Sequence, residues 1–327
     1  MLRSMFSGVS GLRAHQNKMD VIGNNIANVN TVGFKSGRVT FKDSIYQSIS
    51  GSSAGNNVYG GSNPSQIGYG SQVSAISVNF ANGTYEPTGY GTDCMINGSG
   101  FFIVGPKLED MDTGLSNEID GNQISQMYLT RVGEFTIDGD GYLVDANKNV
   151  VYGFVPETAA IGTADMDLGT EIGEGNSLTY GTLKPIRIPL QPADDTESPT
   201  ISYEDGAELM NLTGISIDAN GVISGKAANG NTYKFGVVGV CSVTNPNALE
   251  NAGNSYYKAV SNTGDLQAFA PGNGATGVLQ SGCLEMSNVD LATEFSNMIT
   301  TQRGFQACSK MITVSDEMLE ELVNMKR

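Results

Sequence analysis

The chain has 327 residues, a net charge of −16, 42 glycines, no tryptophan and only 16% charged residues. A chain of this length can bury a sizeable core. Its acidic balance argues against nucleic-acid binding, which needs a basic surface. No window approaches the roughly 18 uncharged apolar residues of a membrane-spanning helix, so we expect no membrane insertion.

Residues 1–30 are predicted to form one helix. Apolar residues recur at steps of three and four, with Gln16 as a polar member of the series. A stripe this narrow is typical of a coiled-coil seam. The N-terminal stripe consists of Leu2, Met5, Val9, Leu12, Met19, Ile22, Ile26 and Val29.

Two further rows lie beside this stripe near the end of the helix. Asn24 and Asn28 are four residues apart, and so are the small residues Gly23 and Ala27. Residues at this spacing share one helix face. Residues 30–33 are expected to end the helix.

Residues 31–72 are predicted to be a linker or an extended surface segment. The stretch 48–72 is rich in Gly, Ser and Asn and contains no charged residue. This composition is typical of flexible connectors.

Residues 73–284 are predicted to form an all-β domain of short antiparallel strands, because β-branched and aromatic runs are separated by turn signals. Residues 156–212 are acidic and weakly patterned, which indicates an insertion. Strands are expected at 73–80, 101–104, 134–138, 142–145, 150–155, 186–190, 215–218, 234–243 and 255–260.

Residues 285–327 are predicted to form the C-terminal helix, so the fold class is mixed α and β with helices at both ends. Ser315, which precedes Asp316 and Glu317, is expected to cap a new turn. The C-terminal stripe consists of Leu291, Phe295, Met298, Gln302, Phe305, Ile312, Leu319 and Leu322.

The terminal helices need partners, because an isolated helix of this kind is marginal in water. Each helix is the first candidate partner of the other, in a parallel or an antiparallel pair. Residues 1–50 carry six Lys and Arg against two Asp, whereas residues 283–327 carry four Lys and Arg against seven Asp and Glu. Two narrow stripes leave their flanks uncovered, so we favour packing against further copies of the chain. A two-helix stalk in a monomer is the alternative.

Catalytic and metal sites are not indicated. His15 is the one histidine and lies in a predicted helix, which disfavours a Ser-His-Asp site. Residues 138–149 begin like a calcium loop, but Leu143 and Asn149 occupy positions that need Gly and Glu. We therefore expect no enzyme activity, no cofactor and no metal.

The cysteines stand too far apart for a CxxC motif, and we expect four free thiols. They are Cys94, Cys241, Cys283 and Cys308.

Several long motifs resemble those of bacterial flagellar rod and hook proteins. The N-terminal motif is "SGLRAHQNKMDVIGNNIANVNTVGFK", and the C-terminal motif is "SNVDLATEFSNMITTQRGFQACSKMITVSDEMLEELVNMKR". "GSGFFIV", "YLTRVGEFTIDGDGYLVD" and "LQSGCLEMSNVDL" match in the middle. Within the family, "SNVDLATEF" and the ending "ELVNMKR" look like hook-type members, and distal rod-type members are the alternative. "MLRSMFSGVSGL" and "RVTFKD" resemble hook-type members of Gram-positive bacteria, which have a compact middle.

The resemblance implies a helical homo-polymer in which both termini form an inner coiled-coil layer and the β domains lie outside. It implies a flexible joint that passes motor torque to the filament, located in the hook outside the cell. It implies export by the flagellar type III apparatus without a cleaved signal peptide. The implied partners are the distal rod protein, the hook cap protein and the hook-filament junction protein.

The stripe residues, together with Asn24 and Asn28, are the predicted assembly interface, in which the two asparagines fix the register between subunits. A secreted β-rich binding module with helical ends is a less favoured reading.

Overall fold

The computed structural model describes residues 2–55, 60–107, 127–156, 159–162, 171–172, 178–179, 183–191, 199–201, 208–264 and 266–325. Much of the expected insertion at 156–212 lies outside these residues. The chain forms two compact units. The first combines Met1–Val29, Lys35–Asn79 and Val289–Arg327, and the second combines Asn30–Phe34 and Phe80–Asn288.

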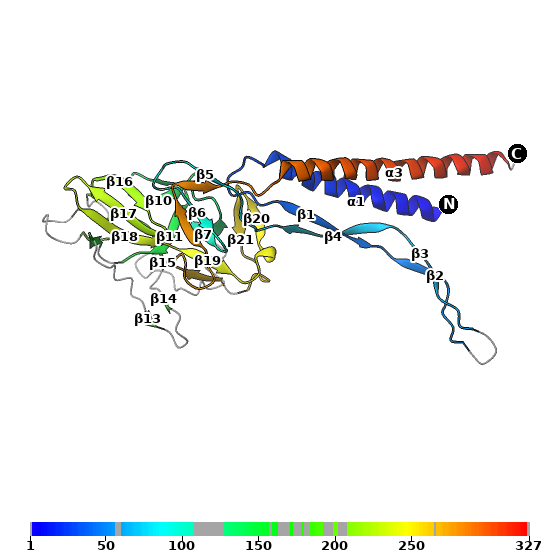
Figure 1. The fold of residues 1–327 in the computed structure, drawn as a ribbon, viewed down its shortest axis with the longest axis horizontal. Coiled ribbons are helices and arrows are strands. Elements are labelled where there is room, and N and C mark those ends of the chain that lie inside the picture. Colours follow the sequence, from blue (N-terminus) through cyan, green and yellow to red (C-terminus); the bar gives the residue numbers. More distant parts are fainter. Residues whose placement is uncertain are drawn as a thin grey trace. The chain divides into compact units, whose positions relative to one another are not determined.

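The first unit contains the two terminal helices, α1 (Leu2–Ala27) and α3 (Leu291–Asn324), packed side by side (Figure 1). The pair is antiparallel, because positions that advance along α1 meet positions that recede along α3. Ser4 lies opposite Ser315 with 3.4 Å between the hydroxyl oxygens. Further along, Gly11 faces Cys308.

Both predicted helices are therefore present, and each has an identifiable boundary. Asp290 caps the start of α3, where its side chain accepts hydrogen bonds from the Ala292 amide at 3.0 Å and the Thr293 hydroxyl at 2.6 Å. These bonds, with Thr293 as the larger cause, lower the pKa of Asp290. The chain beyond α1 turns at Gly33, whose φ is +69°.

The prediction that Ser315 caps a new turn is wrong. Ser315 lies inside the continuous helix α3, and its hydroxyl donates to the Met311 carbonyl at 2.8 Å. A serine hydroxyl can bond to the carbonyl one turn back instead of capping a helix start.

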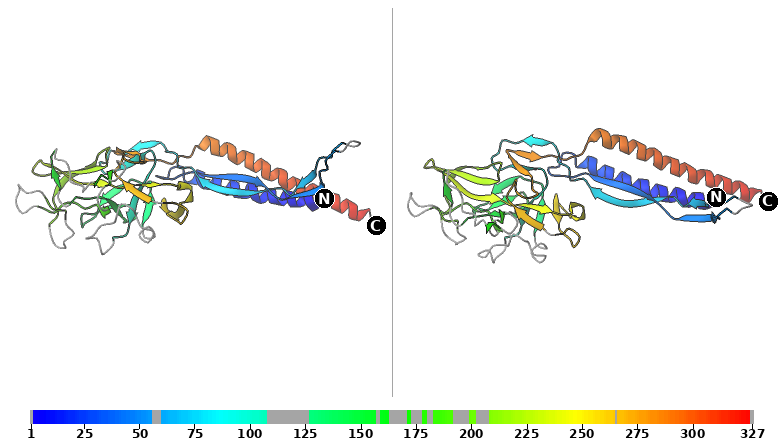
Figure 2. Two further views of the ribbon diagram at one scale, coloured as in Figure 1. Left: turned by 90° about the horizontal axis from the view of Figure 1, so that it is seen from below. Right: turned by 60° about the horizontal axis from the view of Figure 1, so that its bottom comes forward.

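Residues 37–55 and 60–78 form a hairpin arm in the first unit (Figure 2). Strand β1 (Gly37–Asp43) pairs antiparallel with β4 (Ser71–Val78), and both strands contact α1. Further out, β2 (Tyr46–Ser50) pairs with β3 (Ser65–Gly68). Much of the segment predicted as a linker is thus a paired ribbon. The strand expected at 73–80 is present as β4, but it belongs to this arm and not to the predicted β domain, because it pairs with β1.

Within its described residues, the second unit is built on a 14-stranded sheet in which all pairs are antiparallel. Its main path runs β16-β17-β18-β11-β7-β8-β21-β20. The strands of this unit are β5 (Tyr85–Pro87), β6 (Cys94–Asn97), β7 (Phe101–Gly105), β8 (Tyr128–Thr130), β9 (Phe135–Ile137), β10 (Leu143–Asp145), β11 (Val150–Phe154), β12 (Ala160–Ile161), β13 (Glu171–Ile172), β14 (Leu178–Thr179), β15 (Leu183–Pro185), β16 (Leu212–Ile217), β17 (Val222–Ala227), β18 (Thr232–Val238), β19 (Val240–Val243), β20 (Glu250–Gly253), β21 (Tyr256–Lys258), β22 (Leu266–Phe269), β23 (Val278–Ser281) and β24 (Cys283–Glu285).

The core covers both faces of this sheet. On β7, Phe102 and Val104 face one apolar cluster, and Phe101 and Ile103 face the other. Alternate side chains of a strand point to opposite faces, so β7 is buried on both. The alternation explains why "FFIV" is an unbroken apolar run.

Two strand predictions in the second unit need correction. Residues 186–190 make only isolated bridges, since Pro185 and Pro189 have no backbone N–H to donate. The strand expected at 234–243 is divided at Gly239 into β18 and β19. The chain changes partners there, because β18 pairs with β11 and β17 whereas β19 pairs with β7 and β22.

The close approach of the two helices gives a direct test of the packing. A Cβ at Gly11 would lie 2.9 Å from the Cys308 sulfur, whereas one at Gly23 would meet nothing within 4 Å. We expect Gly11→Val to lower the free energy of unfolding of the helix pair by roughly 1–3 kcal/mol, the usual cost of overpacking. Far-UV circular dichroism in denaturant measures it.

Gly23→Val is the matched control, because it makes the same change in helix propensity without a clash. Equal stability of the two variants would contradict a close contact at Gly11.

Candidate assembly surfaces

The first unit exposes a large amount of apolar surface on its helices. Among the described residues, the exposed apolar side chains of α3 include Phe295 at 50%, Ile299 at 58% and Val323 at 69% exposure. On α1, Phe6 is 64% exposed. Exposed apolar side chains that share a helix face, as Phe295 and Ile299 do at a spacing of four residues, mark an interaction site. The other exposed apolar residues of α3 are Leu291, Phe305, Met311, Val314, Met318, Leu322 and Met325.

The predicted stripes are only partly covered by the helix pair. Ile22 is buried. Half-buried members are Met5, Leu12, Met19, Ile26, Val29, Met298, Ile312 and Leu319. Exposed members are Val9, Leu291, Phe295, Gln302, Phe305 and Leu322.

The contact between α1 and α3 includes small residues that the predicted N-terminal stripe did not contain. Gly8 faces Ile312, and Gly304 faces the His15 ring, whose nearest atom would lie 2.8 Å from an added Cβ. Burial, followed by the charge of Lys18, lowers the pKa of His15. Small residues at steps of three and four (Ser4, Gly8, Gly11) were the available sequence signal for this contact.

Asn25, which the sequence analysis passed over, joins α1 to the hairpin arm. Its side chain is 1% exposed. It donates to the Gly37 carbonyl at 2.9 Å and accepts from the Gly37 amide at 2.9 Å. Both polar ends of the buried amide are thereby satisfied, and the start of β1 is held against the last turns of the helix.

Asn24 and Asn28, the predicted register residues, bond to each other within α1. The Asn28 side chain donates to the Asn24 backbone carbonyl at 2.9 Å and to its side-chain oxygen at 3.0 Å. Asn24 is exposed and Asn28 is half-buried. Their role between subunits stays a prediction.

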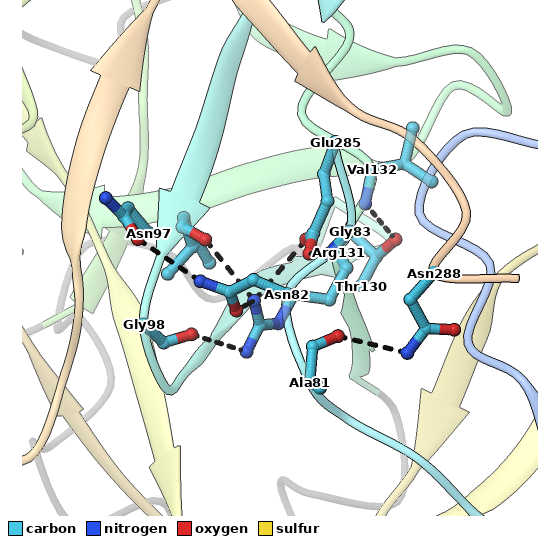
Figure 3. Close-up of polar contacts among 11 residues, drawn as sticks. Ala81, Asn82, Gly83, Asn97, Gly98, Thr130, Arg131, Val132, Glu285 and Asn288 are labelled. Atoms are coloured by element: carbon cyan, nitrogen blue, oxygen red, sulfur yellow. Dashed lines mark hydrogen bonds and ion pairs between the residues drawn. The ribbon is translucent and has the colours of Figure 1, made fainter. Parts of the chain in front are cut away.

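A buried ion pair joins Arg131 to Glu285 in the second unit (Figure 3). Arg131 is 2% exposed and Glu285 is fully buried, with 3.4 Å between guanidinium and carboxylate. The guanidinium also donates to the Gly98 carbonyl at 2.9 Å and lies 5.2 Å from the Phe101 ring centre. Burial lowers the pKa of Arg131, and the Glu285 carboxylate opposes that shift.

Glu285 also binds two other chain segments that are distant from it in the sequence. Its carboxylate accepts from the Gly83 amide at 3.0 Å, and its backbone carbonyl accepts from the Gly33 amide at 2.8 Å. The residues that follow α1 are thus fixed to the second unit through hydrogen bonds to a strand near the other end of the chain. Sequence reasoning did not identify this pair, since neither residue lies in a periodic pattern.

The described residues hold no cluster of three or more His, Cys, Asp or Glu side chains arranged to bind a metal. No helix in the described part of the chain is both long and apolar enough to cross a membrane. The four cysteines are free, as predicted. Burial raises the pKa of Cys241 to about 12, and burial together with Asp93 raises that of Cys94, so both thiols are protonated core side chains.

Models of known protein families match both termini of the chain, and individual relatives match it over its whole length. Residues 5–35 match the family model described as flagella basal body rod protein, and residues 280–325 match the C-terminal model of flagellar basal body rod FlgEFG proteins. The flagellar basal-body rod protein FlgG of Bacillus subtilis is 40% identical over 328 residues, with all of both chains covered. The flagellar hook protein FlgE of Borreliella burgdorferi is 32% identical over 442 residues, again with all of both chains covered.

Asn25→Ala should destabilise the first unit by roughly 1–3 kcal/mol, because the Gly37 amide and carbonyl lose their buried partner. Denaturant unfolding followed by far-UV circular dichroism measures the loss. Asn24→Ala, one position away and exposed, is the control and should change stability by less than about 0.5 kcal/mol. An equal loss in both variants would show that helix propensity, and not the bonds to Gly37, is responsible.

Glu285→Ala should destabilise the second unit by roughly 3–5 kcal/mol, since it leaves the Arg131 charge buried without its partner. Glu86→Ala, on the exposed strand β5 that pairs with β24, removes the same type of side chain without breaking a buried pair. In thermal melts, we expect Glu285→Ala to unfold at a much lower temperature than the wild type, and Glu86→Ala to unfold close to the wild-type temperature. Melting of both variants at the wild-type temperature would contradict the assigned role of the pair.

Proposed function

Because this chain belongs to the flagellar rod and hook protein family, we propose that it polymerises into the tube of the flagellar hook. The family is a structural one, and the chain is a structural subunit of the flagellum. The hook is supported by the full-length match to a hook protein and by the C-terminal motif "SNVDLATEF". Such a tube transmits torque from the motor to the filament.

The exposed apolar face of α3 is the observation that carries self-assembly. Each of Phe295, Ile299 and Phe305 would contribute roughly 1.5–3 kcal/mol if a neighbouring subunit buried it fully. Residues four apart, such as Phe295 and Ile299, lie on one face of the helix, so a single neighbour can cover both. The helix stripes and the Asn24–Asn28 pair are the proposed interface.

The second unit supplies the outer contacts in this proposal. Acidic and rich in Ser, Thr and Asn, it offers polar contacts that water can bridge and that re-form at low cost as neighbours slide. We propose that the helices transmit twist, whereas these contacts allow the tube to bend.

The distal rod is the second candidate. It is favoured by the 40% identity to a protein named as a rod subunit, over an alignment of 328 residues that covers both chains completely. A rod subunit would build a straight tube, whereas a hook subunit would build a curved one.

The remaining features of the proposal follow from the hook assignment. The distal rod protein, the hook cap protein and the hook-filament junction protein are the proposed neighbours. Export through the flagellar type III apparatus is the proposed route to a position outside the cell, and we assign no catalytic role.

Electron microscopy of the purified chain under polymerising conditions tests the proposal. We expect wild-type tubes, and no tubes from Phe295→Asp/Ile299→Asp, because charges placed on the exposed face of α3 cannot be buried. Ser296→Asp/Thr300→Asp, on the exposed polar row of the same turns, should still form tubes.

Curved wild-type tubes support the hook and straight ones the rod. An absence of wild-type tubes would contradict both, and normal tubes from the Phe295→Asp/Ile299→Asp variant would show that α3 does not form the interface.

A further inference from the structure

A groove in the first unit lies between α1 and the hairpin arm. It has a volume of about 340 Å³. Phe6, Val9 and Arg13 line it from the helix, and Ser71 and Val73 line it from strand β4. The remaining lining residues are Ser10, Ala14, Asn17, Ser44 and Gln72. Its floor is apolar, and Arg13 provides a positive charge.

Among the described residues, the end of α3 has no helix beside it in this unit. Ser4 lies opposite Ser315, and α1 begins only two residues before Ser4, so α3 continues past the start of α1. Residues 318–325, here named the α3 overhang, therefore extend about 12 Å beyond the helix pair. They expose Met318, Leu322 and Met325 at 46%, 47% and 80%.

The overhang and the groove are complementary in charge. Glu317, Glu320 and Glu321 flank the apolar residues of the overhang, and the described helix has no basic residue after Lys310. Lys326 and Arg327 follow outside the described residues. The groove carries Arg13, on a helix whose only acidic residue is Asp20. A cation near the C-terminal end of a helix is favourable because the carbonyl groups there carry partial negative charge.

The length of the groove and the direction of α3 indicate which segment can occupy the groove. The groove follows α1 from Phe6 to Asn17, about 17 Å of helix, so the overhang of about 12 Å can lie along it and insert its apolar side chains. The overhang of the same chain cannot reach its own groove, because α3 is continuous and leads away from α1 beyond Ser4. The occupant must come from another copy that is displaced along the axis of the helix pair.

We propose that the α3 overhang of one subunit docks in the α1 groove of a second subunit, with Glu320 and Glu321 facing Arg13. Met318 and Leu322 then cover Phe6 and Val9, and the contact repeats head to tail along the assembly. This inference rests on the proposed function, because it names one lengthwise contact within the polymer.

Charge exchange tests the contact in the full-length chain. Arg13→Glu alone and Glu320→Lys/Glu321→Lys alone should each raise the critical concentration for polymerisation about tenfold or more, since like charges then face each other. Sedimentation measures the critical concentration, and circular dichroism confirms the fold of each variant. Arg38→Glu, an exposed residue of β1 outside the groove, is the matched control and should leave the critical concentration unchanged.

Combining the two sets of substitutions distinguishes a specific docking contact from a general effect of charge on polymerisation. A chain with all three substitutions should polymerise within about threefold of the wild-type critical concentration, and an equimolar mixture of the two defective variants should form copolymers. Wild-type polymerisation by Arg13→Glu, or a loss that the triple variant does not repair, would overturn the docking and leave the proposed function standing. A wild-type chain that does not polymerise would overturn both.

Discussion

The close approach of α1 and α3 is the constraint on which the first unit depends. Gly8 and Gly11 on one helix and Gly304 on the other leave room for Ile312, Cys308 and His15. The contact therefore needs few large apolar side chains, which instead remain on the outer faces of the helices. A pair built in this way buries little apolar surface of its own, yet it presents much of that surface to its surroundings. In the proposed assembly, a neighbouring copy covers the apolar side chains that this close glycine contact leaves outside.

The hairpin arm gives α1 a second neighbour and limits which faces remain open. Strands β1 and β4 contact the helix, and Asn25 fixes the start of β1 through two bonds to Gly37. Between this arm and α1 lies the groove that contains Arg13. The arm therefore both shields the helix and shapes a surface that another subunit can enter.

The sequence predicted the parts of the fold that depend on local periodicity. Both helices and most of the strands follow from apolar spacing, and the glycine turns at Gly141 and Gly221 have the positive φ that such turns require. The pairing of the arm was missed because Gly and Ser dominate residues 48–72, and a backbone ladder leaves little trace in such a sequence. Asn25 and Glu285 were missed for a different reason. Gly37, Gly33 and Gly83 bind them through backbone groups, which no residue pattern marks as partners, and Arg131 is brought to Glu285 from 154 positions away in the chain only by the fold.

The two units are stabilised by different means, and this difference bears on how a subunit could change state during assembly. The second unit has a sheet that is covered on both faces and a buried ion pair that holds three distant segments, so its stability is internal. The helices instead leave Phe295, Ile299 and the overhang exposed, and their stability must rise when copies bind. Binding that favours the folded form stabilises it by mass action, in proportion to the logarithm of the free subunit concentration. In the proposed assembly, polymerisation therefore stabilises the folded helices, whereas the β unit depends on its own core and ion pair.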